Sequence, residues 1–182
     1  MARIQRVSKG KTMRPNYFVF CEGETEKAYV SILRAHYRAP IQIIAKKTLL
    51  NITPDLANRV KAAYVCTKND RTFLMYDLDV TSMLERLRRI PGATLLCSNP
   101  CIELWLLLHH ADQKKSLTSK ECVDRLVSHV PSYRKGTIDA GLKQTLLTTK
   151  AMAVERARRS EIYENPSTSV YKLIEALDDF LD

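Results

Sequence analysis

The residues Tyr17-Phe-Val-Phe-Cys-Glu22-Gly-Glu-Thr-Glu26 lead from an apolar run directly into a turn that carries carboxylates. The run over residues 17–21 is aromatic and β-branched without polar alternation, which is typical of a strand buried on both faces. Gly23 is expected to permit a tight turn after this strand, and Thr25 is expected to cap the helix that follows. The segment therefore predicts the first strand, turn and helix of an α/β fold.

The same order of strand and helix repeats further along the chain. Apolar runs predict four strands, at residues 17–21, 41–45, 72–76 and 93–97. Capping residues and apolar spacing predict helices that begin at Thr25, at Thr53 (ending near Thr67), at Thr81 or Ser82 (ending near Arg89) and at Ile102 (ending at His110). This alternation predicts an α/β, Rossmann-like fold, in which a four-stranded parallel sheet is flanked by helices.

The strand signal stops after the fourth strand, and the rest of the chain is expected to be helical. Helices are predicted over residues 118–128, 139–159 and 168–181. The expected organisation is a basic flexible arm over residues 1–14, an α/β core over 15–112, and a C-terminal helical extension over 113–182 that packs on the core. The arm has no apolar centre, so it is not expected to be a signal peptide.

Composition limits the class of protein and its partners. The chain has 182 residues and a net charge of +9, from 29 Lys and Arg against 20 Asp and Glu. Such a charge favours an anionic partner such as nucleic acid, although a basic protein without such a partner remains an alternative. The five cysteines form no CxxC pair, and reduced thiols indicate the cytoplasm. No apolar run is long enough to cross a membrane, and the five glycines form no phosphate-binding P-loop, which excludes a P-loop nucleotide hydrolase.

Carboxylates follow two of the predicted strands, at the point where each strand ends. Glu22 comes directly after the first strand, and Asp77 and Asp79 come after the third. Ligands of parallel α/β sheets bind at the carboxyl ends of the strands, so these side chains are expected to meet at one edge. Crowded carboxylates repel one another unless a cation lies between them, and hard oxygen ligands suit Mg²⁺ or Mn²⁺. The pattern predicts a metal-dependent site for a phosphate-bearing substrate.

Three further glutamates lie near this predicted edge. Glu26 is four residues after Glu22 and can share its face, and Glu103 opens a very apolar helix after the fourth strand. Glu24 lies between Glu22 and Glu26 and is better explained as a solvated residue that interacts with the helix dipole. Dipole and turn-capping roles remain the alternatives at each acidic position. The candidate catalytic and metal-binding residues are Glu22, Glu26, Asp77, Asp79 and Glu103.

These motifs resemble known families. The turns Glu22-Gly-x-x-Glu26 and Asp77-x-Asp79 resemble the Toprim domain, in which such acids bind divalent metal. Ser98-Asn-Pro-Cys-Ile-Glu103-Leu-Trp, together with the late Asn165-Pro-Ser-Thr, is similar to the RloB-like family. The resemblance implies a Toprim-like core and a nuclease effector in bacterial anti-phage defence and abortive infection, encoded beside an ATPase partner of the AAA or ABC type. Many Toprim domains have a glycine after the Asp-x-Asp pair, whereas this chain continues with Val80-Thr-Ser.

The leading hypothesis is metal-assisted phosphodiester hydrolysis of DNA or RNA, with Mg²⁺ or Mn²⁺ as cofactor. Candidate nucleic-acid contacts are Lys46, Lys47, Arg134 and Lys135, although a solvated surface charge is the favoured explanation for any single one of them. One alternative is a nucleic-acid or nucleotide sensing subunit of a defence complex with a degenerate metal site. Another is a different phosphoryl-transfer enzyme with the same ion geometry. The sequence leaves open whether the chain forms a homo-oligomer.

Overall fold

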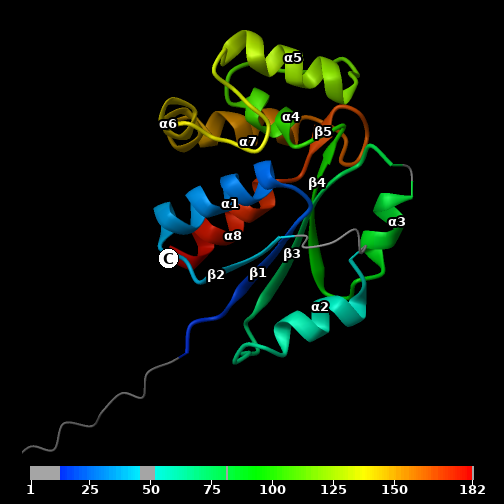
Figure 1. Ribbon diagram of the computed structural model, residues 1–182, viewed down its shortest axis with the longest axis vertical. Coiled ribbons are helices and arrows are strands. Elements are labelled where there is room, and N and C mark those ends of the chain that lie inside the picture. Colours follow the sequence, from blue (N-terminus) through cyan, green and yellow to red (C-terminus); the bar gives the residue numbers. More distant parts are fainter. Residues whose placement is uncertain (1–12, 46–51, 81, 182) are drawn as a thin grey trace, which may run out of the picture.

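The computed structural model describes residues 13–45, 52–80 and 82–181, which form one sheet flanked by helices (Figure 1). The elements in chain order are β1 (Tyr17–Cys21), α1 (Glu24–Tyr37), β2 (Ile41–Ala45), α2 (Pro54–Lys61), β3 (Arg71–Asp77), α3 (Met83–Arg88), β4 (Ala93–Asn99), α4 (Glu103–Leu108), α5 (Ser119–His129), α6 (Ala140–Thr148), α7 (Lys150–Arg158), β5 (Ser167–Thr168) and α8 (Tyr171–Leu181).

The sheet has the strand order β2-β1-β3-β4-β5. The first four strands are parallel, with Cys21 of β1 in register with Met75 of β3, and β5 is antiparallel to β4. The predicted α/β, Rossmann-like fold is thus confirmed, and the structure adds a fifth strand of two residues. The order reverses between β1 and β3, and this is where ligands bind in open parallel sheets.

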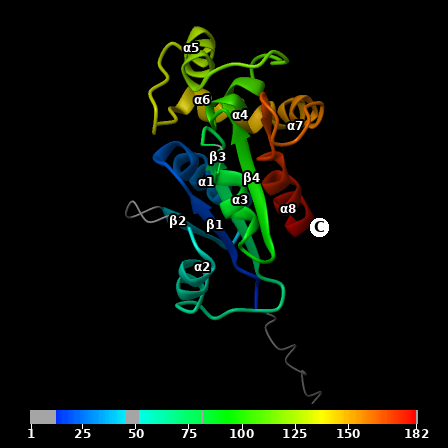
Figure 2. The same ribbon diagram turned by 90° about the vertical axis from the view of Figure 1, so that its right-hand side faces the viewer.

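Each face of the sheet is covered by its own helices. Tyr17 and Val19 of β1 pack in one apolar cluster with α1 and α8, whereas Phe18 and Phe20 pack in a second cluster with α2 and α3. The two pairs of helices lie on opposite sides of the sheet in Figure 1, and α3 lies in front of it in Figure 2. Because successive strand residues point to opposite faces, strands buried on both sides need apolar residues throughout.

The helices α4, α5, α6 and α7 gather beyond the carboxyl ends of the strands, at the top of Figure 1. The helix predicted over 139–159 is interrupted at Thr149, whose hydroxyl donates to the carbonyl of Thr145 at 2.8 Å and bonds to Nδ1 of His109 at 2.9 Å. Such side-chain bonds compete with the regular helix ladder. These helices form the layer that faces the predicted site.

Several predicted helix boundaries were wrong. The helix predicted to reach Thr67 ends at Lys61, because Asp70 accepts bonds from the Thr67 hydroxyl and the Asn16 backbone and holds a turn before β3. The last helix begins at Tyr171 rather than at residue 168, because the preceding residues pair with β4. Thr25 does not cap α1, whose N-cap is Gly23. Local sequence does not reveal such tertiary partners.

The cysteines agree with the sequence-based expectations. All five cysteines are free, and Cys21 and Cys97 are buried as expected for thiols that end apolar runs. None of the described helices combines the length and the apolar composition that a membrane crossing requires. The division into arm, core and extension stays a prediction, since most of the arm lies outside the described residues.

Candidate functional site

The carboxyl ends of β1 and β3 bring two of the predicted acids together. The backbone N–H of Glu22 donates to the carbonyl of Met75 at 3.1 Å, which continues the strand pairing one residue past β1. The backbone N–H of Asp77 in turn donates to Oε2 of Glu22 at 3.1 Å. Glu22 and Asp77 therefore lie side by side at the point where the strand order reverses.

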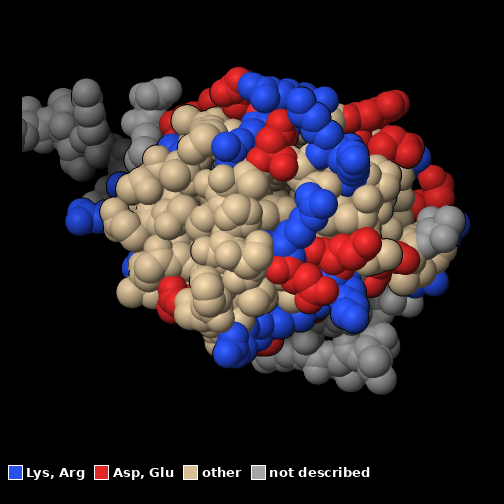
Figure 3. Space-filling view, turned by 90° about the horizontal axis from the view of Figure 1, so that it is seen from above, with Lys and Arg blue, Asp and Glu red and all other residues tan. Residues whose placement is uncertain are grey.

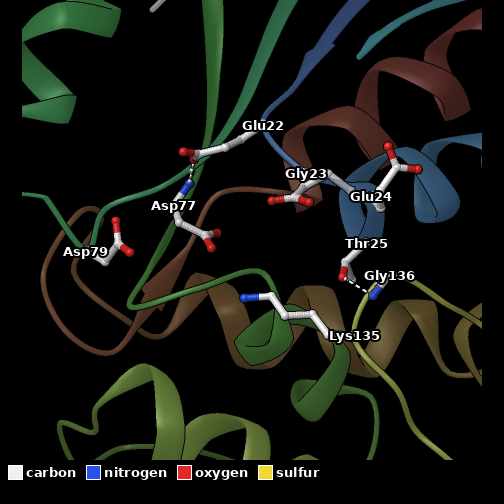
Figure 4. A pocket seen from close by; sticks show the side chains of 9 residues that line it. Glu22, Gly23, Glu24, Thr25, Asp77, Asp79, Lys135 and Gly136 are labelled. Carbon is white, nitrogen blue, oxygen red and sulfur yellow. Dashed lines mark hydrogen bonds between the residues drawn. The ribbon is translucent and has the colours of Figure 1, made fainter. Parts of the chain in front are cut away.

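A cavity of about 320 Å³ opens at this sheet edge (Figure 4). Asp77 points into it toward Lys135, and its Oδ1 accepts from the backbone N–H of Ile102 at 2.8 Å. That bond fixes Asp77 against the start of α4. The lining residues are Glu22, Gly23, Glu24, Thr25, Glu26, Asp77, Asp79, Lys135 and Gly136. The cavity thus joins acids from two strand ends with a lysine from the segment between α5 and α6.

Glu26 lies one helical turn after Glu22 and is buried, with 4% of its surface exposed. Gly23 makes room for it, because a Cβ at this position would lie 2.9 Å from Oε2 of Glu26. The backbone of Gly23 is extended, at φ −130° and ψ −175°, a conformation open to any residue. The turn after β1 therefore does not depend on a conformation special to glycine, and the missing side chain of Gly23 instead leaves space for a carboxylate.

Glu103 is fully buried behind the cavity, at 0% exposure. The hydroxyl of Tyr133 donates to its Oε1 at 2.7 Å, while its Oε2 has no hydrogen-bond partner among the described residues. A buried carboxylate oxygen without a partner carries a high desolvation cost. Such an atom is the kind of ligand that a bound cation would satisfy.

Two acids of the site, Asp77 and Glu26, lie in surroundings that disfavour their charged forms. Burial, together with the neighbouring Glu26, Glu103 and Glu22, raises the pKa of Asp77 to about 9. Burial and the charges of Glu103 and Glu22 raise the pKa of Glu26 to about 7. The carboxylate of Glu103 is the largest cause of a raised pKa at Lys135. Burial and the neighbouring carboxylates therefore disfavour the ionised forms of Asp77 and Glu26.

The raised pKa values predict how the stability of the metal-free protein depends on pH. In the folded state Asp77 and Glu26 keep protons that the unfolded chain releases near pH 3.8 and 4.5. Their contribution to the free energy of unfolding is therefore fully present at acid pH and is lost as pH rises, up to about 7 for Glu26 and about 9 for Asp77. We expect the difference in Tm between Mg²⁺ and EDTA to widen from about pH 5 to about pH 9.

Thermal unfolding across this pH range, with Mg²⁺ or EDTA, measures that difference. A variant carrying both Asp77→Asn and Glu26→Gln provides the control, because it lacks both titrating groups and should show a Tm difference that stays constant. A constant difference in the unsubstituted protein would contradict the assignment of the titrating carboxylates to a cation site.

The acids share one region without yet forming a coordination shell. Within residues 13–45, 52–80 and 82–181, no group of three or more His, Cys, Asp or Glu side chains is arranged to hold a metal ion. Mutual repulsion of carboxylates explains why they stand apart. Their hard oxygen atoms and the unpartnered Oε2 of Glu103 nevertheless fit Mg²⁺ or Mn²⁺ in chemistry.

The remaining predicted site residues lie in different places. Asp79 is exposed and stands apart at the edge of the cavity, while exposed Glu24 points away from Asp77 and pairs with Lys27 at 3.2 Å (Figure 4). Arg134 donates to the carbonyl of Tyr133 at 2.7 Å and so bonds within its own segment. Lys46 and Lys47 lie outside the described residues. Of the predicted basic residues, Lys135 is the one that lines the cavity.

Sequence reasoning missed the residues that attach the helical layer to the acids. Tyr133 holds Glu103, and the hydroxyl of Thr25 accepts from the backbone N–H of Gly136 at 2.9 Å. Gly136 has a φ of +83°, which favours glycine. In the sequence, the glycine at the end of Tyr133-Arg-Lys-Gly136, between two predicted helices, could have indicated a turn at this position. The partners of this loop are distant in the chain, however. Thr25 is 111 positions from Gly136, and Glu103 is 30 positions from Tyr133.

The space at Gly23 gives a second prediction. Gly23→Ala should lower the affinity for Mn²⁺ by about tenfold, because the new methyl group displaces the carboxylate of Glu26. The change in Tm should be small, since the extended backbone accepts alanine. Calorimetric titration with Mn²⁺ measures the affinity. Gly141→Ala is the matched control, because its Cβ would meet Oδ1 of Asp139 at an ordinary 3.5 Å. Unchanged Mn²⁺ affinity in Gly23→Ala would show that binding does not depend on the position of Glu26.

Comparison with known proteins identifies one family. The family model described as RloB-like protein matches residues 17–177, which span β1 to the last helix and include every described acid of the cavity. Searches of curated proteins and of solved structures gave no match. Because the family model covers well over half of the chain, this protein belongs to the RloB-like family.

Proposed function

We propose that this chain is a Toprim-like, divalent-metal-dependent nuclease that hydrolyses phosphodiester bonds in DNA or RNA. The observation that carries this proposal is the meeting of Glu22, Glu26 and Asp77 in one cavity, where burial and neighbouring carboxylates raise the pKa of Asp77 and Glu26. The basic net charge of +9 supports an anionic substrate. Membership of the RloB-like family, with the motifs that suggested it, supports a cytoplasmic role in anti-phage defence beside an ATPase partner.

The residues that would hold Mg²⁺ or Mn²⁺ are Glu22, Glu26 and Asp77, with Glu103 behind them and Asp79 at the edge. A bound ion would supply Lewis-acid chemistry, which activates water and offsets charge on the phosphate oxygens. Hydrolysis forms a bond from a water oxygen to phosphorus and breaks the bond from phosphorus to the leaving sugar oxygen, which takes up a proton. The proton that the water gives up would pass to a cavity carboxylate that does not hold the ion, or to solvent.

The surface around the cavity offers a nucleic acid separate basic side chains rather than one continuous basic area. Lys and Arg side chains alternate with Asp and Glu over the face seen from above, with a broad uncharged area beside them (Figure 3). A polyanion that crosses this face meets both signs of charge. Its affinity is therefore proposed to depend on individual lysines and arginines rather than on one continuous basic stripe.

A second candidate function is a nucleic-acid sensing subunit with a degenerate metal site. It is favoured by the observation that the acids of the described residues do not form a ready group of three ligands. The two functions differ in turnover. A sensor would bind nucleic acid without cutting it, whereas a nuclease would cut it in the presence of a divalent ion.

Incubation of the purified chain with DNA, RNA and tRNA in Mg²⁺, Mn²⁺ or EDTA tests the proposal, alone and with the ATPase partner. The nuclease proposal expects cleavage with Mg²⁺ or Mn²⁺ and none with EDTA. Cleavage that persists in EDTA would contradict metal dependence. Binding without cleavage under all of these conditions would favour the sensor.

A further inference from the structure

Lys135 reaches the acids from outside the sheet. It belongs to the segment over residues 130–139, between α5 and α6, which we call the lysine segment. Its amine extends across the cavity toward Asp77, opposite the strand ends that supply Glu22 and Asp77 (Figure 4). Among the described residues that line the cavity, Lys135 is thus the cation that faces the acidic strand ends.

The lysine segment is anchored on both sides of Lys135. Two residues before it, the hydroxyl of Tyr133 donates to buried Glu103 at 2.7 Å. One residue after it, the backbone N–H of Gly136 donates to Oγ1 of Thr25 at 2.9 Å, and Thr25 is 2% exposed. Both anchors end on residues beside the cavity acids. The backbone of Lys135 is therefore fixed relative to the carboxylates.

The turn itself fixes where the side chain of Lys135 begins. Arg134 and Thr137 form an isolated antiparallel bridge, in which the N–H of Thr137 donates to the carbonyl of Arg134 at 3.0 Å. Gly136 packs closely on α1, since a Cβ there would lie 3.3 Å from Cβ of Glu24. These contacts hold a tight loop against the first turn of α1, with Lys135 at its tip.

A lysine in this position is poorly explained by metal binding alone. An ammonium group cannot ligate a metal ion, and its charge opposes the entry of a second cation. It is suited instead to an anion bound between itself and the metal, because a lysine interacts with phosphate as a compact point charge. Phosphoryl-transfer sites place cations around the transferred group in this way.

We propose that Lys135 is a further catalytic residue, which contacts a non-bridging oxygen of the scissile phosphodiester across the cavity from the carboxylates. This inference rests on the proposed nuclease function. It identifies the side of the cavity formed by the lysine segment as the side that receives the phosphate. The lysine segment supplies the phosphate contact, and the strand ends supply the metal ligands. The alternative is a purely structural lysine that neutralises the buried acids.

The two roles differ in what Lys135→Met does to metal binding and to turnover. A phosphate contact predicts that kcat falls about 100-fold, while Mn²⁺ affinity stays the same or rises because a competing cation is gone. Lys135→Arg should recover part of the lost kcat, because it retains the charge. A structural lysine predicts that Tm falls while kcat, measured well below Tm, stays within about threefold of that of the unsubstituted chain. Lys143→Met, at an exposed position in α6, is the matched control.

The experiment combines kinetics of oligonucleotide cleavage, titration with Mn²⁺, and binding of DNA and RNA oligonucleotides in Ca²⁺, which replaces the active ion. Cleavage by Lys135→Met within about threefold of the unsubstituted chain would overturn the role of Lys135 and leave the nuclease proposal intact. If the unsubstituted chain cuts nothing, the nuclease proposal fails. The phosphate contact then stands only if Lys135→Met weakens metal-dependent oligonucleotide binding by about tenfold or more. Unchanged binding overturns it.

Discussion

Asp77→Asn is expected to lower metal-dependent cleavage by at least about 100-fold, the largest loss expected at any position. Asp77 is the last residue of β3, points into the centre of the cavity, and is fixed by the N–H of Ile102 at 2.8 Å. Asparagine is nearly isosteric, so that bond is retained while one negative charge is lost. In EDTA the variant should unfold at a higher Tm, since a repelled buried carboxylate is removed.

The test measures kcat, Mn²⁺ affinity and Tm for the same preparation. Asp55→Asn is the matched control, because Asp55 is an exposed first-turn residue of α2, remote from the strand ends. Asp79→Asn should have a smaller effect than Asp77→Asn, as Asp79 is exposed at the edge of the cavity. Retention of cleavage by Asp77→Asn would remove Asp77 from the catalytic residues, and a lower Tm in EDTA would contradict the repulsion argument.

Glu103→Gln is the second substitution with a large expected effect. Glutamine can still accept the bond from the Tyr133 hydroxyl, but it replaces a carboxylate oxygen by an amide group. If Oε2 of Glu103 serves a cation, cleavage should fall by about 100-fold and Mn²⁺ affinity by about tenfold, with the fold retained. Circular dichroism, Mn²⁺ titration and the cleavage assay together measure these quantities.

A control separates this effect from general loss of charge. Glu85→Gln changes an exposed glutamate that pairs with Arg88 at 3.0 Å, so it should leave cleavage and Mn²⁺ affinity unchanged. Tyr133→Phe keeps both carboxyl oxygens of Glu103 but removes its hydrogen-bond donor, and it should lower kcat by less than Glu103→Gln does. Full activity of Glu103→Gln would show that Glu103 only packs against Tyr133.

The fold followed closely from the sequence because its strands are buried on both faces. Apolar runs predicted β1 and β2 with the bounds that the structure has, and β3 and β4 to within two residues. A run that is apolar at every position indicates, without any knowledge of its partners, that both faces of the strand are buried. Ser167–Thr168 was missed as a strand because two polar residues form it only through pairing with β4. Tertiary contact, rather than local preference, determines that element.

The site was predictable where it depended on strand ends and helix spacing. Glu22 and Asp77 meet because their strands are neighbours, and Glu26 joins them through its spacing of four residues. The depth of Glu103 and the anchoring of Lys135 were not predictable, since both depend on how the lysine segment packs across the strand ends. The sequence shows which residues carry charge, but a distant segment decides which charges face one another.

An anomalous difference map from crystals soaked in Mn²⁺ tests the central claim most directly, because it locates the ion without requiring a known substrate. We predict a peak between Glu22, Glu26 and Asp77, with a contribution from Glu103, and no such peak in Asp77→Asn crystals. A map without Mn²⁺ in this cavity at saturating concentration, or with the ion at another site, would contradict the claim that these carboxylates form a metal centre.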